Sequence, residues 1–277
     1  MPPQPDLSGR PYRGSMPNTR RHATLSGVAA LAVALTAGGA AGAQPMTAPL
    51  PTGSEPVVLD PADFTTRITN PYWPMRPGDR WIYRETGADG ARQRDVVTVT
   101  RRTRLIANGV TARVVHDVAS RRGRPLEVTD DWYAQDEAGN VWYLGEDTVE
   151  YEHGKPVSRE GSFEAGVDGA QAGVIMPARP RPGLRYRQEH YAGHAEDRAR
   201  IVSLHEQVQT PAGHYTRVLM TRETNPLEPR VLEFKFYARG VGPVLAVTVS
   251  GGAEREELMR RERGVTSAES VVWPPGR

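Results

Sequence analysis

The sequence contains no cysteine among its 277 residues. This absence excludes disulfides, thiolate metal sites, a cysteine nucleophile and a lipid-modified N-terminal cysteine. The folded domain must therefore be stabilised by its core alone. Without the leader that is predicted below (residues 1–43), the chain has roughly 230 residues. A chain of this length can bury about 70% of its unfolded surface, so a single domain without cross-links is feasible.

The sequence also lacks the usual motifs of several enzyme classes. It has no serine nucleophile elbow, no His-Glu-x-x-His zinc motif, no P-loop and no dinucleotide fingerprint. We therefore expect no nucleotide cofactor, and no serine hydrolase or zincin in its usual motif form. A hydrolase or lyase built from carboxylates, histidine and tyrosine would leave no such motif, so enzymatic activity is left open.

The N-terminal apolar run is too short for a membrane span. It extends from Ala23 to about Thr36, roughly 14 residues, whereas a bilayer-spanning helix needs about 20. The basic pair Arg20-Arg21 precedes it and the small-residue site Ala41-Gly42-Ala43 follows. These are the parts of a secretory signal peptide. Residues 1–43 are thus predicted to be removed, by Sec or twin-arginine export, with an uncleaved anchor as the alternative.

Export with cleavage would give a periplasmic or extracellular protein without a transmembrane segment. It would also leave almost no net charge, since the whole sequence is +2 and the leader carries four arginines against one aspartate, which leaves about −1. Without a global attraction to polyanions, no nucleic-acid partner is expected.

The mature sequence consists mainly of short β-type runs separated by turn residues. Runs such as "RWIYRET" and "VLEFKFYA" recur about every 12–16 residues between turns such as "GADG" and "ANG". This pattern predicts an all-β domain over residues 63–258, an antiparallel meander forming a curved sheet or partly closed barrel.

The segments around these runs read differently. Residues 44–62 are rich in proline and small polar residues and predict a flexible N-terminal arm. Residues 160–183 have too many glycines and prolines for a strand and predict a long loop. Residues 259–277 are assigned to a C-terminal tail, and the 3.6-periodic "AEREELMRRER" indicates a surface helix or a frayed end.

The stretch "NPYWPMRPGDRWIY" (70–83) resembles the opening of secreted bacterial β-proteins. The stretch "DDWYAQDEAGNVWYLGED" (130–147), together with "EGSFEAGVDGAQAGVIMPA" and "YARGVGPV", resembles a family of exported bacterial proteins that is uncharacterised. The resemblance covers most of residues 64–258 and implies a β-rich exported domain, but no activity. Arg239 stands where the resemblance implies proline, and His190 and His194 stand where it implies no histidine.

Residues 130–147, "DDWYAQDEAGNVWYLGED", form the densest stretch of the sequence. A tight turn at its centre predicts a hairpin in which Asp130 faces Asp147 and Asp131 faces Glu146. Like charges directly opposite one another are unfavourable. They can be neutralised by neighbouring arginines, of which the sequence has 33, can bind a hard cation such as calcium, or can serve a polar-ligand or active site.

The same hairpin carries two Trp-Tyr pairs. The register places Trp132 and Tyr143 on one face, and Tyr133 and Trp142 on the other. We take these four residues as the candidate ligand-binding surface, because aromatic rings next to acids can stack on a sugar or another ring.

Two further segments supply candidates. Glu164 and Asp168 lie in the Gly-rich stretch "EGSFEAGVDGA" and could overhang a pocket. With Asp131 and Glu146 they are the candidate catalytic carboxylates if the protein is an enzyme, and His194 could act with them.

A metal site is a weaker hypothesis. The candidate ligands are His190, His194, Glu196 and Asp197, and a divalent cation would be the cofactor. Along a strand, however, four residues span about 13 Å, so only a turn at Gly193 could bring the two histidines together.

Three functions follow from these features. The leading hypothesis is a non-catalytic exported β-domain that binds a polar or amphiphilic small molecule or a cell-envelope component. The alternative is a secreted hydrolase or lyase based on carboxylates and histidine, with or without a metal. The third is an interaction protein whose hairpin edges pair with a partner strand.

Overall fold

The structure is a computed structural model that describes residues 49–264. The predicted signal peptide (1–43) and the end of the predicted C-terminal tail lie outside the described residues. The strands are β1 (Phe64–Thr65), β2 (Arg80–Thr86), β3 (Arg92–Leu105), β4 (Thr111–Arg121), β5 (Arg124–Asp136), β6 (Val141–Glu152), β7 (Lys155–Ser158), β8 (Phe163–Glu164), β9 (Gln171–Met176), β10 (Arg185–Arg187), β11 (Glu189–His190), β12 (Arg198–Thr210), β13 (Gly213–Thr224), β14 (Leu232–Ala238), β15 (Gly242–Ser250) and β16 (Arg255–Glu262). A single 3-10 turn, η1 (Pro61–Asp63), is the only helical element of this part of the chain.

The strands form a continuous antiparallel sheet, and the predicted all-β fold is confirmed. The order is β10-β12-β13-β14-β15-β16-β2-β3-β4-β5-β6-β9-β11. Neighbours in the sheet are mostly neighbours in sequence, as a meander requires. The exceptions are β10–β12, β6–β9, β9–β11 and β16–β2, and the last of these joins the last long strand to the first.

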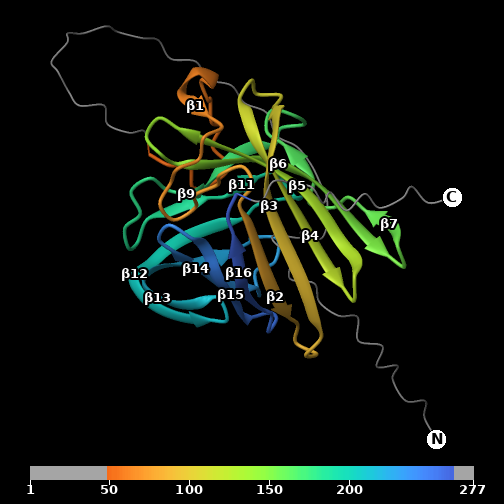
Figure 1. The fold of residues 1–277 in the computed structure, drawn as a ribbon. Coiled ribbons are helices and arrows are strands. Elements are labelled where there is room, and N and C mark those ends of the chain that lie inside the picture. Colours follow the sequence, from red (N-terminus) through yellow and green to blue (C-terminus); the bar gives the residue numbers. More distant parts are fainter. Residues whose placement is uncertain (1–48, 265–277) are drawn as a thin grey trace, which may run out of the picture.

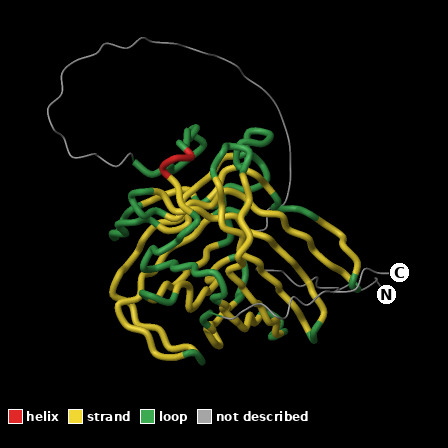
Figure 2. The backbone as a smooth tube through the Cα atoms, turned by 45° about the horizontal axis from the view of Figure 1, so that its top comes forward, coloured by secondary structure: helices red, strands yellow, loops and turns green. Residues whose placement is uncertain are grey.

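The sheet is strongly curved. The long strands β2 to β6 make one wall and β12 to β15 the other, with β16 between β2 and β15 (Figures 1 and 2). Near the two ends of the sheet, β10 also contacts β9, which brings the sheet close to closure into a barrel. The side chains of one sheet face therefore point into an interior.

Strand β16 corrects one prediction. The segment "AEREELMRRER" is a central strand and neither a helix nor a frayed end. Its even-numbered residues include the fully buried Leu258 and the buried Glu254, while Arg255 is exposed. The segment is compatible with both periods, and pairing with two neighbouring strands decides in favour of the strand.

Strand β9 corrects another. Residues 160–183 do contain loops, but the expectation that no strand lies there is wrong, because Gln171–Met176 pairs with β6. Gly173 does not break this strand. A Cβ at this position would lie 2.3 Å from the backbone carbonyl carbon of Gln188, so glycine lets the neighbouring chain approach closely.

The described part of the expected N-terminal arm packs against the sheet. The backbone N–H of Arg187 donates to the carbonyl of Pro51 at 2.7 Å, and its guanidinium donates to the carbonyls of Gly53 and Glu55. Arg187 is 1% exposed. A buried arginine therefore holds residues 51–55 against the sheet.

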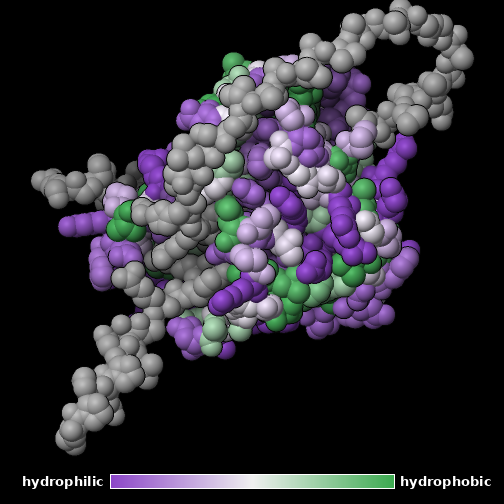
Figure 3. Space-filling view, turned by 180° about the vertical axis from the view of Figure 1, so that it is seen from behind, coloured by the Kyte–Doolittle hydropathy of each residue, from purple (hydrophilic) through white to green (hydrophobic). Residues whose placement is uncertain are grey.

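The interior has two halves of different character. One half is an aromatic core, in which the Trp73 ring lies 6.0 Å from Tyr133 and 5.5 Å from Tyr237, and the rings of Tyr133 and Tyr143 stack at 4.9 Å. The other half, towards the ends of β2, β4 and β15, is lined by carboxylates. The outer surface is mixed, with hydrophilic residues between smaller hydrophobic areas on the face in Figure 3.

Candidate functional site

The acidic hairpin is formed by β5 and β6, and its predicted register is confirmed for the acids. Asp130 pairs with Asp147, and Asp131 pairs with Glu146. Side chains alternate along a strand, so the first pair points outwards and the second points into the interior. The two pairs are neutralised in different ways.

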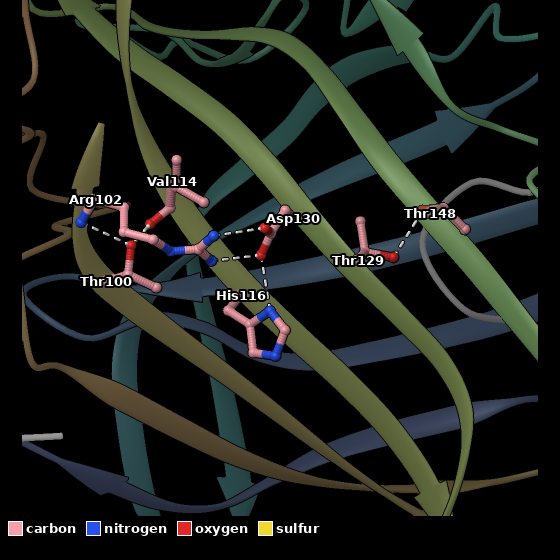
Figure 4. A network of polar contacts seen from close by, with 7 residues as sticks. All are labelled: Thr100, Arg102, Val114, His116, Thr129, Asp130 and Thr148. Carbon is pink, nitrogen blue, oxygen red and sulfur yellow. Dashed lines mark hydrogen bonds and ion pairs between the residues drawn. The ribbon is translucent and has the colours of Figure 1, made fainter. Parts of the chain in front are cut away.

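The outer pair is neutralised by arginine. The Arg102 guanidinium makes two hydrogen bonds to Asp130, at 2.8 and 2.9 Å, and the His116 ring lies 2.7 Å from the same carboxylate (Figure 4). Arg159 pairs with Asp147. Although burial opposes ionisation of Asp130, hydrogen bonds from His116 and Arg102 hold its pKa below the usual value. Arginine pairing therefore explains the outer acids.

The inner pair shares a tyrosine. The Tyr143 hydroxyl oxygen lies 2.7 Å from both Asp131 Oδ1 and Glu146 Oε2. A phenol has one hydrogen, so both contacts can be hydrogen bonds only if one carboxyl is protonated and donates to the phenol oxygen. Burial raises the pKa of Asp131 to about 7 and raises that of Glu146 well above its usual value. The geometry and the pKa shifts agree on a shared proton.

The aromatic residues differ from the prediction in their pairing. Tyr133 faces Tyr143 on the inner side, whereas the predicted register put them on opposite faces, and Ala134 faces Trp142. The cause is a bulge, since Leu144 and Gly145 on β6 oppose a single residue of β5. All four aromatic residues of the predicted ligand-binding surface are buried, with Trp132, Tyr133, Trp142 and Tyr143 between 3% and 7% exposed.

The bulge yields a stability prediction. Gly145 has φ 136°, and a Cβ there would lie 2.3 Å from the carbonyl oxygen of Phe163. We expect Gly145→Ala to lower the free energy of unfolding by about 3 kcal/mol or more, from backbone strain and overpacking together. Gly90→Ala is the matched control, because Gly90 also has positive φ but nothing within 4 Å of a Cβ, and it should cost about 1–2 kcal/mol. Equal losses in urea unfolding would contradict the role of the close contact.

Asp131 and Glu146 belong to a larger interior cavity of about 60 Å³. Nine carboxylates and one ammonium line it, together with Ala119, Thr129, Ala246 and Thr248. The charged lining residues are Glu85, Asp95, Asp117, Glu127, Asp131, Glu146, Glu233, Lys235, Glu254 and Glu256. None of the 28 arginines between residues 49 and 264 lines it, so the arginines that neutralise the outer face leave the interior acidic.

Six adjacent strands each contribute at least one acid to this cavity, and one acid from each strand forms a continuous series. In sheet order the acids are Glu256, Glu85, Asp95, Asp117, Asp131 and Glu146, on β16, β2, β3, β4, β5 and β6. Glu256 faces Glu85 directly, as Asp131 faces Glu146, and the other steps are diagonal by two residues. We call this series the acidic arc. The sequence shows each acid but not the register that aligns them.

Burial keeps several cavity carboxyls protonated near neutrality. It raises the pKa of Glu85 to about 7 and that of Glu233 to about 7. The pKa values of Asp117 and Glu256 are raised well above their usual values, first by burial and then by the neighbouring Asp95. The charge of the cavity therefore changes between about pH 6 and 8.

Some cavity oxygens have no partner within residues 49–264. Both carboxylate oxygens of Glu254, a side chain only 4% exposed, lack a hydrogen bond, and so does Asp95 Oδ1. Leaving a buried polar group unpaired costs about 1–3 kcal/mol, and more for a charge. These oxygens are the part of the cavity wall that can accept hydrogen bonds from a ligand.

One ammonium already lies among these acids. Lys235 Nζ is 2.9 Å from Glu223 Oε2 and 4.0 Å from Glu233 Oε1, and the side chain is 8% exposed. Burial alone would lower the pKa of Lys235, but the attraction of Glu223 and Glu233 raises it. Lys235 is therefore charged, and its ion pairs lie within the wall opposite the arc, on β13 and β14.

The other predicted catalytic residues lie away from the cavity. Glu164 accepts hydrogen bonds from Arg104 and from the backbone N–H of Ala107, and Asp168 lies in an exposed turn with φ 49°. His194 stacks on the Tyr191 ring at 4.4 Å. Of the five groups expected to converge in an enzyme, the structure brings Asp131 and Glu146 together and leaves the other three apart.

The predicted metal ligands are placed around the turn at Gly193. Glu196 accepts the backbone N–H of Gly193 at 3.0 Å, and burial lowers the pKa of His190. Burial raises the pKa of Asp197 to about 8. Over residues 49–264, no group of three or more His, Cys, Asp or Glu side chains is arranged to hold a metal ion.

In the same part of the chain, no helix is long and apolar enough to span a membrane.

Comparison with known proteins gives no family. No family model matches the chain, and no curated protein matches it. Two solved structures are similar to part of it. One is a predicted exported protein with a YmcC-like fold from Bacteroides fragilis, 14% identical, with a TM-score of 0.41 over 70% of this chain and 100% of that chain. The other is a predicted lipoprotein from Parabacteroides distasonis, 11% identical, with a TM-score of 0.39 over 69% of this chain and 98% of that chain. Likeness at this level carries no inference about function.

Proposed function

We propose that this chain is an exported β-rich protein that binds a small, positively charged polar ligand in its acidic cavity. Export is inferred from the leader pattern of residues 1–43. The ligand is a free organic cation or the cationic group of a cell-envelope component. The observation that carries the proposal is the buried carboxylate of Glu254, which has no hydrogen-bond partner among residues 49–264, in a cavity lined by nine acids and one ammonium.

The charge distribution supports a cation over other ligands. An anion would meet the same carboxylates and be repelled, and a neutral ligand would leave their charge uncompensated. A bound ammonium would donate up to three hydrogen bonds to acceptors that lack them. The electrostatic repulsion among the carboxylates, which destabilises the ligand-free protein, would be relieved by a bound cation.

An organic cation fits better than a metal ion. Calcium needs six to eight oxygens at about 2.3–2.6 Å, converging on one point. The acids of the arc are instead distributed over six neighbouring strands, and none of the described residues form a metal-holding group. The acidic wall thus suits a ligand that carries several positive charges spread along its length.

The binding test compares three compounds of equal length and different charge. We expect 1,5-diaminopentane to raise the unfolding temperature at pH 8, while 1,5-pentanediol and glutarate leave it unchanged. At a hundred times the dissociation constant the gain is about 2.7 kcal/mol, a shift of several degrees for a domain of this size. An equal response to diamine and diol would refute a cation site.

A substitution in the cavity links binding to stability. Glu254→Met replaces a buried charge by an apolar side chain of similar length, so we expect the ligand-free protein to gain about 1–3 kcal/mol and diamine affinity to fall at least about tenfold. Glu137 in the exposed β5–β6 turn supplies the control, and Glu137→Met should change neither quantity. Unchanged affinity in Glu254→Met would remove Glu254 from the site.

A further inference from the structure

The spacing of the acidic arc narrows the ligand class, provided that the proposed cation binding holds. Directly facing residues on adjacent strands have Cβ atoms about 4.5–5.5 Å apart, and diagonal neighbours are about 7–8 Å apart. Glu256 and Glu85 are of the first kind, and Asp95 and Asp117 are of the second. Because carboxylates reach beyond Cβ, the arc presents a continuous row of acceptors, in which Asp95 lies within hydrogen-bonding reach of both Asp117 and Glu256.

A linear polyamine can follow such a row of acceptors. With bonds of about 1.5 Å, ammonium groups separated by three or four methylenes lie about 5–6 Å apart in an extended chain. Each ammonium can reach one or two carboxylates of the arc, and the methylenes between them need no polar partner. A single ammonium would neutralise only one end of the arc.

The dimensions of the cavity favour a thin chain. A volume of about 60 Å³ admits several water molecules but leaves little room for a bulky ring. The interior next to the acids is apolar, with Val97, Val115 and Pro243 beside Asp117 and Asp131. Methylene groups can contact that surface while the charged groups face the carboxylates.

Lys235 provides a precedent within the protein. Its side chain is a butyl-ammonium on β14, and its Nζ reaches Glu223 of the neighbouring strand β13 at 2.9 Å. The opposite wall thus already binds one alkyl-ammonium group, while Glu254 and Asp95 Oδ1 have no donor within the described residues. These unfilled positions belong to other elements than the filled one, since Glu254 directly precedes β16 and Asp95 lies on β3.

We propose that the ligand is a linear polyamine with three or more ammonium groups, bound along the acidic arc from Glu256 to Glu146. Its terminal groups meet the carboxylates near Glu254 and Glu85 at one end and near Asp131 at the other. The ammonium of Lys235 limits the number of further positive charges that the cavity accepts.

Calorimetric titration of the full mature chain with butylamine, 1,4-diaminobutane, spermidine and spermine tests this class. We expect affinity to rise roughly tenfold with each added ammonium up to three, as charge-assisted hydrogen bonds accumulate. Raising the salt concentration should weaken spermine more than butylamine. Calcium at the same concentration should not compete with spermine.

Each outcome separates the two proposals. If all four amines bind with similar affinity, the cation site stands and the polyamine inference fails. If none binds better than 1,4-butanediol, both fail. Glu85→Gln is the matched variant, because it removes one charge of the arc without shortening the side chain. It should weaken spermidine about tenfold and butylamine less, whereas equal losses for both would place the ligand elsewhere.

Discussion

Replacing Lys235 by methionine should destabilise the protein by about 3–5 kcal/mol, the usual cost of removing one partner from a buried charged pair. Lys235 Nζ is the only ammonium that lines the acidic cavity in the described part of the chain. Without it, the carboxylates of Glu223 and Glu233 lose their counter-charge at 2.9 and 4.0 Å. Urea unfolding at pH 7 measures the change.

The sequence offers a matched control, because Lys155 is its second and last lysine. Lys155 lies exposed on β7, and Lys155→Met should change the free energy of unfolding by less than about 0.5 kcal/mol. Adding Glu223→Gln to Lys235→Met should restore part of the loss, which a double-mutant cycle quantifies. Equal effects of the two lysine substitutions would contradict the description of the cavity as charged and buried.

The ligand-free protein should become less stable as pH rises from 5 to 8. Burial raises the pKa of Glu85 from 4.5 to about 7 and that of Asp131 from 3.8 to about 7. Between those values the folded protein keeps protons that the unfolded chain has lost, so stability falls as pH rises through the folded pKa. For Glu85 alone the difference is on the order of 3 kcal/mol, or about 6 °C or more in unfolding temperature.

Thermal unfolding in matched ionic strength at pH 5, 6, 7 and 8 measures this slope. Below about pH 4 other carboxyls act in the opposite direction, because hydrogen bonds hold the pKa of Asp130 and Glu257 below the usual value despite their burial. Stability should therefore be highest near pH 5. Glu85→Gln should flatten the slope and the exposed Glu137→Gln should not. An unfolding temperature that rises from pH 5 to 8 would show that the cavity carboxyls ionise freely in the folded state.

The sequence was informative about the elements of this fold. Alternating runs separated by turn residues predicted most long strands, and the register of Asp130 and Asp131 followed from one tight turn. The errors arose where a residue has two physical meanings. Gly173 signals a loop by composition, yet in the structure it is the place where the backbone of Gln188 comes close. The segment around Leu258 fits a helix and a strand equally well until its neighbours are known.

Only part of the site could be predicted from the sequence. Asp131 and Glu146 were identified because a local hairpin brings them together. The rest of the arc depends on the pairing of strands far apart in sequence, as Glu256 with Glu85 shows. No local pattern encodes that register. A sign was nevertheless present in the bias of the chain, since acids such as Asp95 and Asp117 occur at inward positions of strands whose outward positions carry arginine or histidine.

The pairing of β16 with β2 has a consequence for the order of folding. Arg255 pairs with Thr86, 169 positions earlier (255 − 86). Contacts of such sequence separation form slowly, because a long loop must close before they contribute. We therefore expect β16 to dock late, so that the acids of β2 to β6 face water and bear their full charge until then. The final strand therefore adds Glu254 and Glu256 and dehydrates the other acids in the same step, so repulsion opposes the event that completes the protein. A cation present during folding would favour closure, and the ligand would then act on the rate at which the sheet closes as well as on the finished structure.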